Sequence, residues 1–235
     1  MGDDELWRRF REDGYIYLPG MLDRDELLAA RRTTLEKLDQ AGYLDPNYPL
    51  MDGVAKDELA LSAQPDLAKD NEPLNRVLYD GRMITFYEQF LGGPVSHFDF
   101  TWCRVKTSSS ETATRPHFDI VFMGRGTKDL YTSWTPLGDV LREMGGLIIL
   151  ENSHRLEDIK QSYGTLDVDV YCTNYPDAAE IESGEKRWHR PDTGAYTQDA
   201  IGLRQELGLR WLTADYKLGD LLIFSMYIMH ARMSR

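Results

Sequence analysis

Cysteine is scarce in this chain of 235 residues, which contains only Cys103 and Cys172. Scaffolds that depend on disulfides carry several cysteines, so the sequence argues against one and favours a reducing compartment. Long apolar runs are also missing, because no stretch approaches the roughly 18 residues that span a bilayer. Residues 1–5 lack the basic and apolar character of a secretory signal. We therefore expect a cytoplasmic protein with no membrane partner.

Positive charge is in the minority, since 39 acidic residues face 27 Lys and Arg and the formal net charge is -12. Proteins that bind nucleic acid cluster their Lys and Arg to neutralise phosphates, so we expect no nucleic-acid partner. The one basic run, residues 186–190, reads Lys-Arg-Trp-His-Arg and is typical of a solvated loop. The acidic balance favours a small-molecule substrate over a polyanionic carrier.

The first 94 residues are dominated by apolar residues at helical spacing. Asp23 lies three residues before Glu26, a pairing that satisfies backbone amides at the start of a helix. The predicted helices cover residues 3–10, 23–42 and 74–91. Residues 14–20 predict an edge strand, and residues 43–72 predict a loop with at most one short helix. Residues 1–94 thus form a helical lead-in.

Short strand-like runs separated by turns begin at residue 95. The predicted strands are 95–107, 118–122, 130–135, 147–150, 220–224 and 227–233. Many short strands after helices indicate an antiparallel sandwich or jelly roll, not alternating βαβ units. Residues 156–211 interrupt them and predict an insertion that acts as a lid. We expect one mainly β domain with flanking helices, an α+β fold, with its strands in residues 95–155 and 212–235.

Two histidines and one aspartate stand in a pattern that suits a non-haem iron. His117 and Asp119 form a His-x-Asp pair, and His230 follows at long range. Residues two apart on a strand share a face, so we expect His117 and Asp119 to point the same way while His230 arrives on a neighbouring strand. Two imidazoles and one carboxylate on one side of iron(II) leave its other side open to a cosubstrate and dioxygen. These three residues are the predicted metal ligands.

A second His-x-Asp pair, His97 and Asp99, competes for this role. It lies at the start of a continuous predicted strand, directly after a helix stop. His117 instead follows the polar stretch 107–114, as a strand at the mouth of a pocket would. We therefore predict that the metal binds at His117 and Asp119.

Taken in order, these motifs resemble the phytanoyl-CoA dioxygenase family, whose members are iron(II)- and 2-oxoglutarate-dependent oxygenases. The most specific elements are the spacing of the three ligands and the segment Gly-Gly-Leu-Ile-Ile-Leu-Glu-Asn-Ser-His-Arg at residues 145–155. The resemblance runs from about residue 12 to the last residue. It implies a double-stranded β-helix (jelly roll, cupin-like) core with helices outside, and iron ligation by His117, Asp119 and His230.

The resemblance also assigns contacts to the cosubstrate. Trp134 matches an aromatic residue beside 2-oxoglutarate, and Lys106 falls on the preceding strand, where some members use a lysine to hold the cosubstrate. The arginine that pairs with the far carboxylate of 2-oxoglutarate follows the distal histidine by about ten residues in the family. We therefore expect it, together with the last strand of the roll, beyond Arg235. His154 matches a turn residue, so we expect a structural role for it.

With iron(II), 2-oxoglutarate and O2, the implied reaction hydroxylates an unactivated C–H bond of a small organic metabolite and releases succinate and CO2. A carboxylate at Asp119 favours hydroxylation, because related halogenases carry a small residue there that makes room for chloride. Aromatic residues of the predicted lid indicate an apolar or ring-bearing substrate. They are Tyr163, Tyr171, Tyr175, Trp188 and Tyr196.

Two other functions remain open at this point. A cupin-like barrel without bound iron would be a small-molecule binding module. A hydrolase would use the same His, Asp and His residues to hold catalytic zinc, which commonly takes three protein ligands and a water. Affinity for iron(II) and 2-oxoglutarate separates the first from an oxygenase, and a requirement for dioxygen separates the second.

Overall fold

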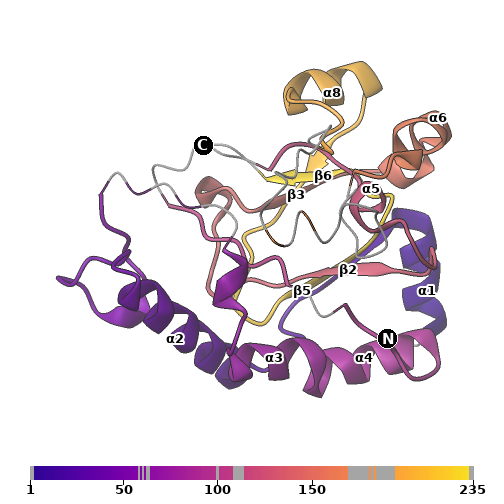
Figure 1. The fold of residues 1–235 in the computed structure, drawn as a ribbon. Coiled ribbons are helices and arrows are strands. Elements are labelled where there is room, and N and C mark those ends of the chain that lie inside the picture. The colour runs from indigo at the N-terminus through magenta and orange to yellow at the C-terminus, as the bar shows by residue number, and fades with distance from the viewer. Residues whose placement is uncertain are drawn as a thin grey trace.

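The computed structural model describes residues 3–57, 59, 61, 64–98, 101–107, 114–168, 180, 183 and 194–232. The longer helices lie in the N-terminal part of the chain, and all strands but one come after them (Figure 1). The helices are α1 (Asp3–Asp13), α2 (Arg24–Gln40), α3 (Glu72–Tyr79), α4 (Gly81–Leu91), α5 (Ile120–Met123), α6 (Glu157–Gln161) and α8 (Ala200–Leu207). The strands are β1 (Tyr15–Leu18), β2 (Tyr131–Trp134), β3 (Leu147–Leu150), β4 (Trp211–Leu212), β5 (Leu221–Ser225) and β6 (His230–Arg232). Short 3-10 turns lie at Leu50–Asp52, Pro65–Leu67, Arg142–Met144, Ser153–Arg155 and Tyr163–Thr165.

These strands form two antiparallel sheets of three strands each. The first sheet has the order β1-β5-β2 and the second the order β4-β3-β6. The predicted edge strand is confirmed, because β1 lies at one edge of the first sheet, next to β5. Antiparallel sheets flanked by helices agree with the predicted class of fold.

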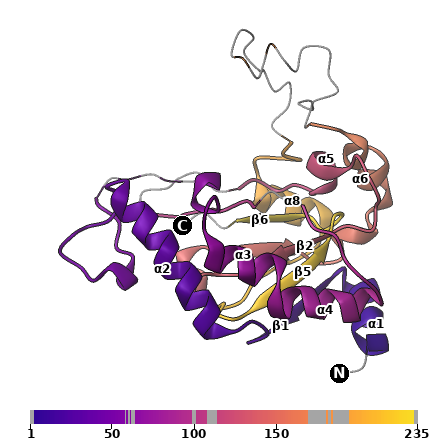
Figure 2. The same ribbon diagram turned by 60° about the horizontal axis from the view of Figure 1, so that its bottom comes forward.

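Strand β5 is buried on both faces, which explains its unbroken apolar sequence. Leu221 and Ile223 point to one face and pack against aromatic residues of α1 and α4. Leu222 and Phe224 point to the other face and pack against Ile149 of the second sheet. Helices α2, α3 and α4 follow one another along the helical side of the first sheet (Figures 1 and 2). The core therefore has a helix-to-sheet layer and a sheet-to-sheet layer that meet at β5.

The N-terminal helices begin and end where local chemistry requires it. Asp23 caps α2, because its side chain accepts hydrogen bonds from the amides of Asp25 at 2.9 Å and Glu26 at 3.2 Å. The predicted helix 74–91 is instead two helices. Asp80 between them is extended, and Gly81 has a φ of +62°, a conformation that glycine adopts without strain. Within the described residues, no helix combines the length and the apolar character needed to cross a membrane.

The strand predicted at 95–107 is wrong for the residues that the structure describes, 95–98 and 101–107, which contain no strand. The carbonyl of Cys103 accepts a hydrogen bond from the amide of Gln64 in the loop after α2, at 2.8 Å. Cys103 and Val105 pack against the apolar cluster beside α2. Among the described residues, this segment is thus held by contacts with a loop and a helix, and within it Arg104 alone forms a β-bridge.

The strand predicted at 118–122 is also wrong, because Asp119 has helical backbone angles and Ile120–Met123 form the one-turn helix α5. Phe118, Ile120 and Val121 are all buried, so the run has no alternation between a buried and an exposed face. A short, continuously apolar run is compatible with a buried helix as well as with a strand. The change alters how Asp119 reaches the site described below.

The predicted insertion, residues 156–211, contains α6, α8 and the start of β4 in its described parts. Strand β4 pairs with β3, so this part of the insertion belongs to the second sheet. The rings of Tyr163 and Tyr196 lie 5.1 Å apart and pack in the core cluster around Phe118. Tyr171, Tyr175 and Trp188 lie outside the described residues. The action of the insertion as a lid stays a prediction.

Gly14 at the end of α1 closely approaches His154. Its φ is +77°, and a Cβ at this position would lie 2.6 Å from Nδ1 of His154 and 2.8 Å from Cδ1 of Ile228. We expect Gly14→Ala to lower the free energy of unfolding by about 2–4 kcal/mol, from backbone strain and overpacking together. Gly20→Ala is the matched control, because Gly20 has a φ of +63° and no atom of the described residues would lie within 4 Å of a Cβ there. Equal losses in urea unfolding of the two variants would show that the contact with His154 contributes nothing.

Candidate metal centre

His117 and His230 are joined by a reciprocal pair of backbone hydrogen bonds. The amide of each residue donates to the carbonyl of the other, and both distances are 3.1 Å. Directly opposite residues of an antiparallel pair send their side chains to the same face. The two imidazole rings accordingly lie with their centroids 4.2 Å apart. This bridge brings together two histidines that are remote in sequence.

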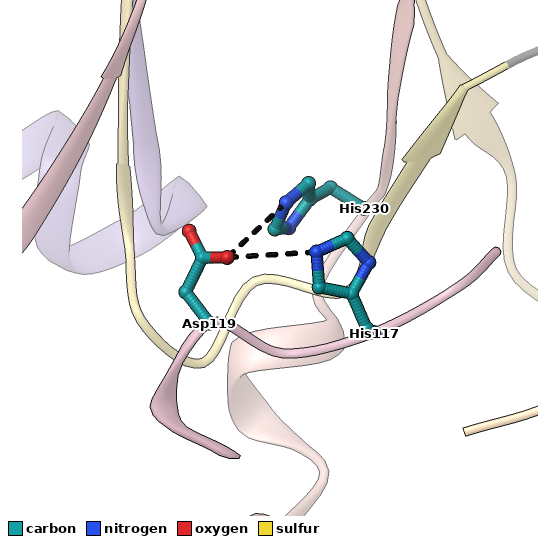
Figure 3. Close-up of side chains that lie close together, drawn as sticks. All are labelled: His117, Asp119 and His230. Atoms are coloured by element: carbon teal, nitrogen blue, oxygen red, sulfur yellow. Dashed lines mark ion pairs between the residues drawn. The ribbon is translucent and has the colours of Figure 1, made fainter. Parts of the chain in front are cut away.

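Asp119 completes the cluster (Figure 3). Its Oδ1 lies 3.5 Å from Nε2 of His117 and 3.5 Å from Nε2 of His230. The candidate ligand atoms of the three residues all lie within 4.8 Å of one another. We expected His117 and Asp119 to share the face of a strand, but the chain turns into α5 at Asp119, and this turn directs the carboxylate toward both imidazoles. The structure thus brings the three predicted ligands together by a different local conformation.

Backbone carbonyls orient both imidazoles. Nδ1 of His117 lies 2.8 Å from the carbonyl oxygen of Arg115, and Nδ1 of His230 lies 3.0 Å from that of Ile228. A carbonyl only accepts, so Nδ1 carries a proton in both rings, and Nε2 is the ring nitrogen that faces Asp119 in each. Burial, together with repulsion from His117, lowers the pKa of His230 to about 4. His230 is therefore neutral near pH 7, the state in which imidazole binds a metal.

Asp119 is buried, and burial alone would raise its pKa. His230, His117 and the hydroxyl of Thr132 outweigh burial and hold the pKa of Asp119 well below its usual range. Thr132 Oγ1 donates to Oδ2 of Asp119 at 2.5 Å. The carboxylate is consequently ionised at neutral pH. Thr132 was not among the residues predicted for the site, although its position two residues before Trp134 on a predicted strand places both on one face.

We expect Thr132→Val to weaken binding of iron(II) by roughly tenfold, because loss of a hydrogen bond that orients a metal ligand typically costs this much or more. Thr132→Ser keeps the hydroxyl and should bind like the wild type. Anaerobic titration of iron(II) into both variants measures the difference. Wild-type affinity in the valine variant would mean that Asp119 is oriented without Thr132.

A cavity of about 1380 Å³ opens beside the cluster, and His117, Asp119 and His230 lie in its wall. Trp134 and Lys106, the residues predicted to contact the cosubstrate, lie in the same wall. The Trp134 ring is half-buried against Tyr216, with centroids 4.6 Å apart. Much of the remaining wall is apolar. It includes Leu78, Met83, Ile84, Tyr87, Met123 and Leu130.

The competing His97 does not join this cluster. It is exposed, and its ring stacks on Tyr79 with centroids 4.2 Å apart. Its partner Asp99 lies outside the described residues. His154 is half-buried next to Gly14, and burial lowers its pKa, which agrees with a structural role. Among the described residues, the group of three around Asp119 is the one set of His, Cys, Asp and Glu side chains arranged to hold a metal ion.

Comparison with known protein families agrees with this geometry. The family model described as Phytanoyl-CoA dioxygenase (PhyH) matches residues 10–232. The chain belongs to the phytanoyl-CoA dioxygenase family. The family predicted from the sequence motifs is thereby confirmed.

One relative of this family member is the 1-deoxypentalenic acid 11-beta-hydroxylase of Streptomyces exfoliatus. The two are 32% identical over 162 residues, which is 65% of this chain and 54% of the hydroxylase. The chain therefore spans about half the length of this relative.

Two solved structures have a similar fold. The non-heme alpha ketoglutarate dependent carbocyclase SnoK from nogalamycin biosynthesis matches with a TM-score of 0.60 and 17% identity, over 100% of this chain and 80% of SnoK. HygX from Streptomyces hygroscopicus, solved with nickel and 2-oxoglutarate bound, matches with a TM-score of 0.55 and 17% identity, over 99% of this chain and 80% of HygX. At such identities the likeness concerns the fold alone.

Proposed function

We propose that the protein is an iron(II)- and 2-oxoglutarate-dependent dioxygenase that hydroxylates a C–H bond of a small organic molecule. The observation that carries this proposal is the convergence of His117, Asp119 and His230 on one wall of a large cavity. Membership of the phytanoyl-CoA dioxygenase family supports it. The name of the Streptomyces exfoliatus relative, a hydroxylase, supports the reaction type.

The donor set fits iron(II). Two imidazoles and one carboxylate form the combination that non-haem iron oxygenases use, with the remaining positions of the metal left open. The three donor atoms already lie close together, and carbonyl oxygens or a hydroxyl fix the far side of each ligand. When bound, iron(II) would supply activation of dioxygen at the expense of 2-oxoglutarate, which leaves as succinate and CO2.

The protein's own share is binding, orientation and exclusion of water. His117, Asp119 and His230 would hold the metal at the lining of the cavity, through which the cosubstrate and dioxygen would reach it. We assign Trp134 and Lys106 to the binding of 2-oxoglutarate, because both lie in the same wall as the ligands. The apolar part of the wall would hold the organic substrate with its C–H bond toward the metal.

We also infer that the two sheets are the halves of a double-stranded β-helix. The face of β5 that carries Leu222 and Phe224 packs against the second sheet, and Phe224 contacts His230 of β6 with ring centroids 4.7 Å apart. A metal site between two facing antiparallel sheets is what a jelly roll would provide. The solved structures with similar folds support this inference.

The test is turnover of 2-oxoglutarate by the protein. Iron(II) and 2-oxoglutarate should bind under anaerobic conditions, and admission of air should release succinate. A substrate screen would begin with 1-deoxypentalenic acid and other small apolar ring compounds, and a substrate should increase succinate release. Binding of neither iron(II) nor 2-oxoglutarate would point to a binding module. Hydrolysis that proceeds with zinc and without dioxygen would point to a hydrolase.

A further inference from the structure

The ring of Phe122 lies beside the metal ligands. Phe122 follows Asp119 by three residues, and its amide donates to the carbonyl of Asp119 at 2.9 Å in the turn that forms α5. Residues three apart on a helical turn lie on one side of it, so the ring is directed toward the same site as the carboxylate. It packs against the imidazole of His117, with ring centroids 5.4 Å apart and planes at 86°. Like both ligands, Phe122 lies in the wall of the large cavity.

The end of the insertion confines this ring on a second side. Gly194 has a φ of +71°, and a Cβ there would lie 2.8 Å from Cε1 of Phe122 and 2.9 Å from Cγ2 of Val168. Only glycine lets the backbone approach the ring so closely. The backbone at this point is itself fixed, because the carbonyl of Gly194 accepts a hydrogen bond from the hydroxyl of Tyr163. The ring of Phe122 is thus held between His117 and Gly194.

A ring held in this way forms a fixed part of the cavity wall. Phe122 is half-buried, and it packs on the apolar cluster that also contains Val121 and Val168. Protein interiors are close-packed, so a ring with contacts on two sides moves little when a bulky group enters the cavity. The space beside the metal ligands therefore depends on the size of this side chain.

We propose that Phe122 limits the size of the group that can reach the metal, and so selects which part of a substrate is brought to it. The inference rests on the proposed function, because it names a residue that determines specificity at the same site. One methylene group more or less in an apolar pocket changes discrimination between ligands by about 10- to 200-fold. Removal of a whole ring should therefore have a large and measurable effect.

Probes that bind the metal itself measure this space without knowledge of the substrate. Nickel(II) would replace iron(II), since imidazole is a suitable ligand for both metals. Imidazole and 4-phenylimidazole would be titrated into the nickel-loaded protein by calorimetry, and the ratio of their affinities compares a small group with a bulky one. Phe122→Ala should shift this ratio toward 4-phenylimidazole by about tenfold or more, and Phe122→Trp should shift it toward imidazole.

Gly194→Ala tests the same ring from its other side. The added methyl group would push Phe122 away from residue 194 and into the site, so the ratio should shift toward imidazole. In the double variant with Phe122→Ala, the change at Gly194 should leave the ratio unaltered, because the ring that it displaces is gone. Gly208→Ala is the control for backbone strain. Gly208 has a φ of +64°, and the described part of the chain has no atom within 4 Å of a Cβ there.

Phe98→Ala is the control for loss of a ring, because Phe98 is 51% exposed, and it should keep the wild-type ratio. Nickel(II) affinity and thermal unfolding, measured in parallel, show which variants fold and hold the metal. If Phe122→Ala does not fold, Phe122→Trp and Gly194→Ala decide the outcome.

The inference is overturned if these variants bind nickel(II) and leave the ratio unchanged, or if 4-phenylimidazole binds to none of them. Such a result would leave the proposed function intact, provided that the wild type turns over 2-oxoglutarate. A wild type that binds neither nickel(II) nor iron(II) would refute the proposed function, and this inference with it.

Discussion

Replacing His117 by alanine is expected to lower the affinity for iron(II) by at least about a hundredfold, whereas His97→Ala should leave it unchanged. Loss of a contact that merely supports a metal ligand already weakens binding 10- to 100-fold, so removal of a ligand should cost more. Nε2 of His117 faces the carboxylate of Asp119 at 3.5 Å. His97 is exposed and stacks on Tyr79. Both variants remove an imidazole. His117→Ala removes it from a buried cluster, and His97→Ala removes it from the surface.

Anaerobic titration of iron(II), with thermal unfolding of the metal-free protein as the check on folding, measures this contrast. His230→Ala should behave like His117→Ala, because the two rings stand opposite each other across the backbone bridge. A loss of affinity in His97→Ala with none in His117→Ala would show that the metal binds at the other His-x-Asp pair.

Phe224→Ala is expected to lower the free energy of unfolding by about 3–5 kcal/mol, the usual cost of removing a buried phenylalanine ring. Phe224 is 1% exposed and lies at the centre of the first sheet, paired with Tyr15 on one side and Thr132 on the other. Its ring also contacts His230. The cavity left by alanine would therefore loosen a metal ligand as well as the core, and iron(II) affinity should fall together with stability.

Urea unfolding of the metal-free protein measures the first effect, and iron(II) titration measures the second. Phe98→Ala is the matched control, because Phe98 is 51% exposed and its removal should change stability by no more than about 0.5 kcal/mol. Similar losses in both variants would mean that Phe224 does not hold the two sheets together.

Local chemistry made several elements predictable from sequence. A capping aspartate marked the start of α2, and the apolar run in β5 matched a strand buried on both faces. The spacing of His117, Asp119 and His230 predicted side chains that the structure does bring together. In these cases the local sequence was compatible with one kind of structure, so it could be predicted.

Other features depended on tertiary contacts that no local pattern reveals. The apolar run after His117 satisfies a strand and a buried helix equally well, and burial on all sides favoured the helix α5. The segment 101–107 has strand-like composition but packs against α2 and a loop. Asp80-Gly81 is a local turn signal inside a helical pattern, and the helix is interrupted there in the structure. The contact of Thr132 with Asp119 arises only in the folded arrangement.

The reciprocal bridge between His117 and His230 has a consequence for biosynthesis. A nascent chain leaving the ribosome presents His117 and Asp119 long before His230 has been made. Until β6 docks, His117 and Asp119 lack the third ligand, His230. His117 also lacks the backbone partner that positions it. Because a preformed site does not exist in the unordered chain, metal uptake should follow the synthesis and docking of β6.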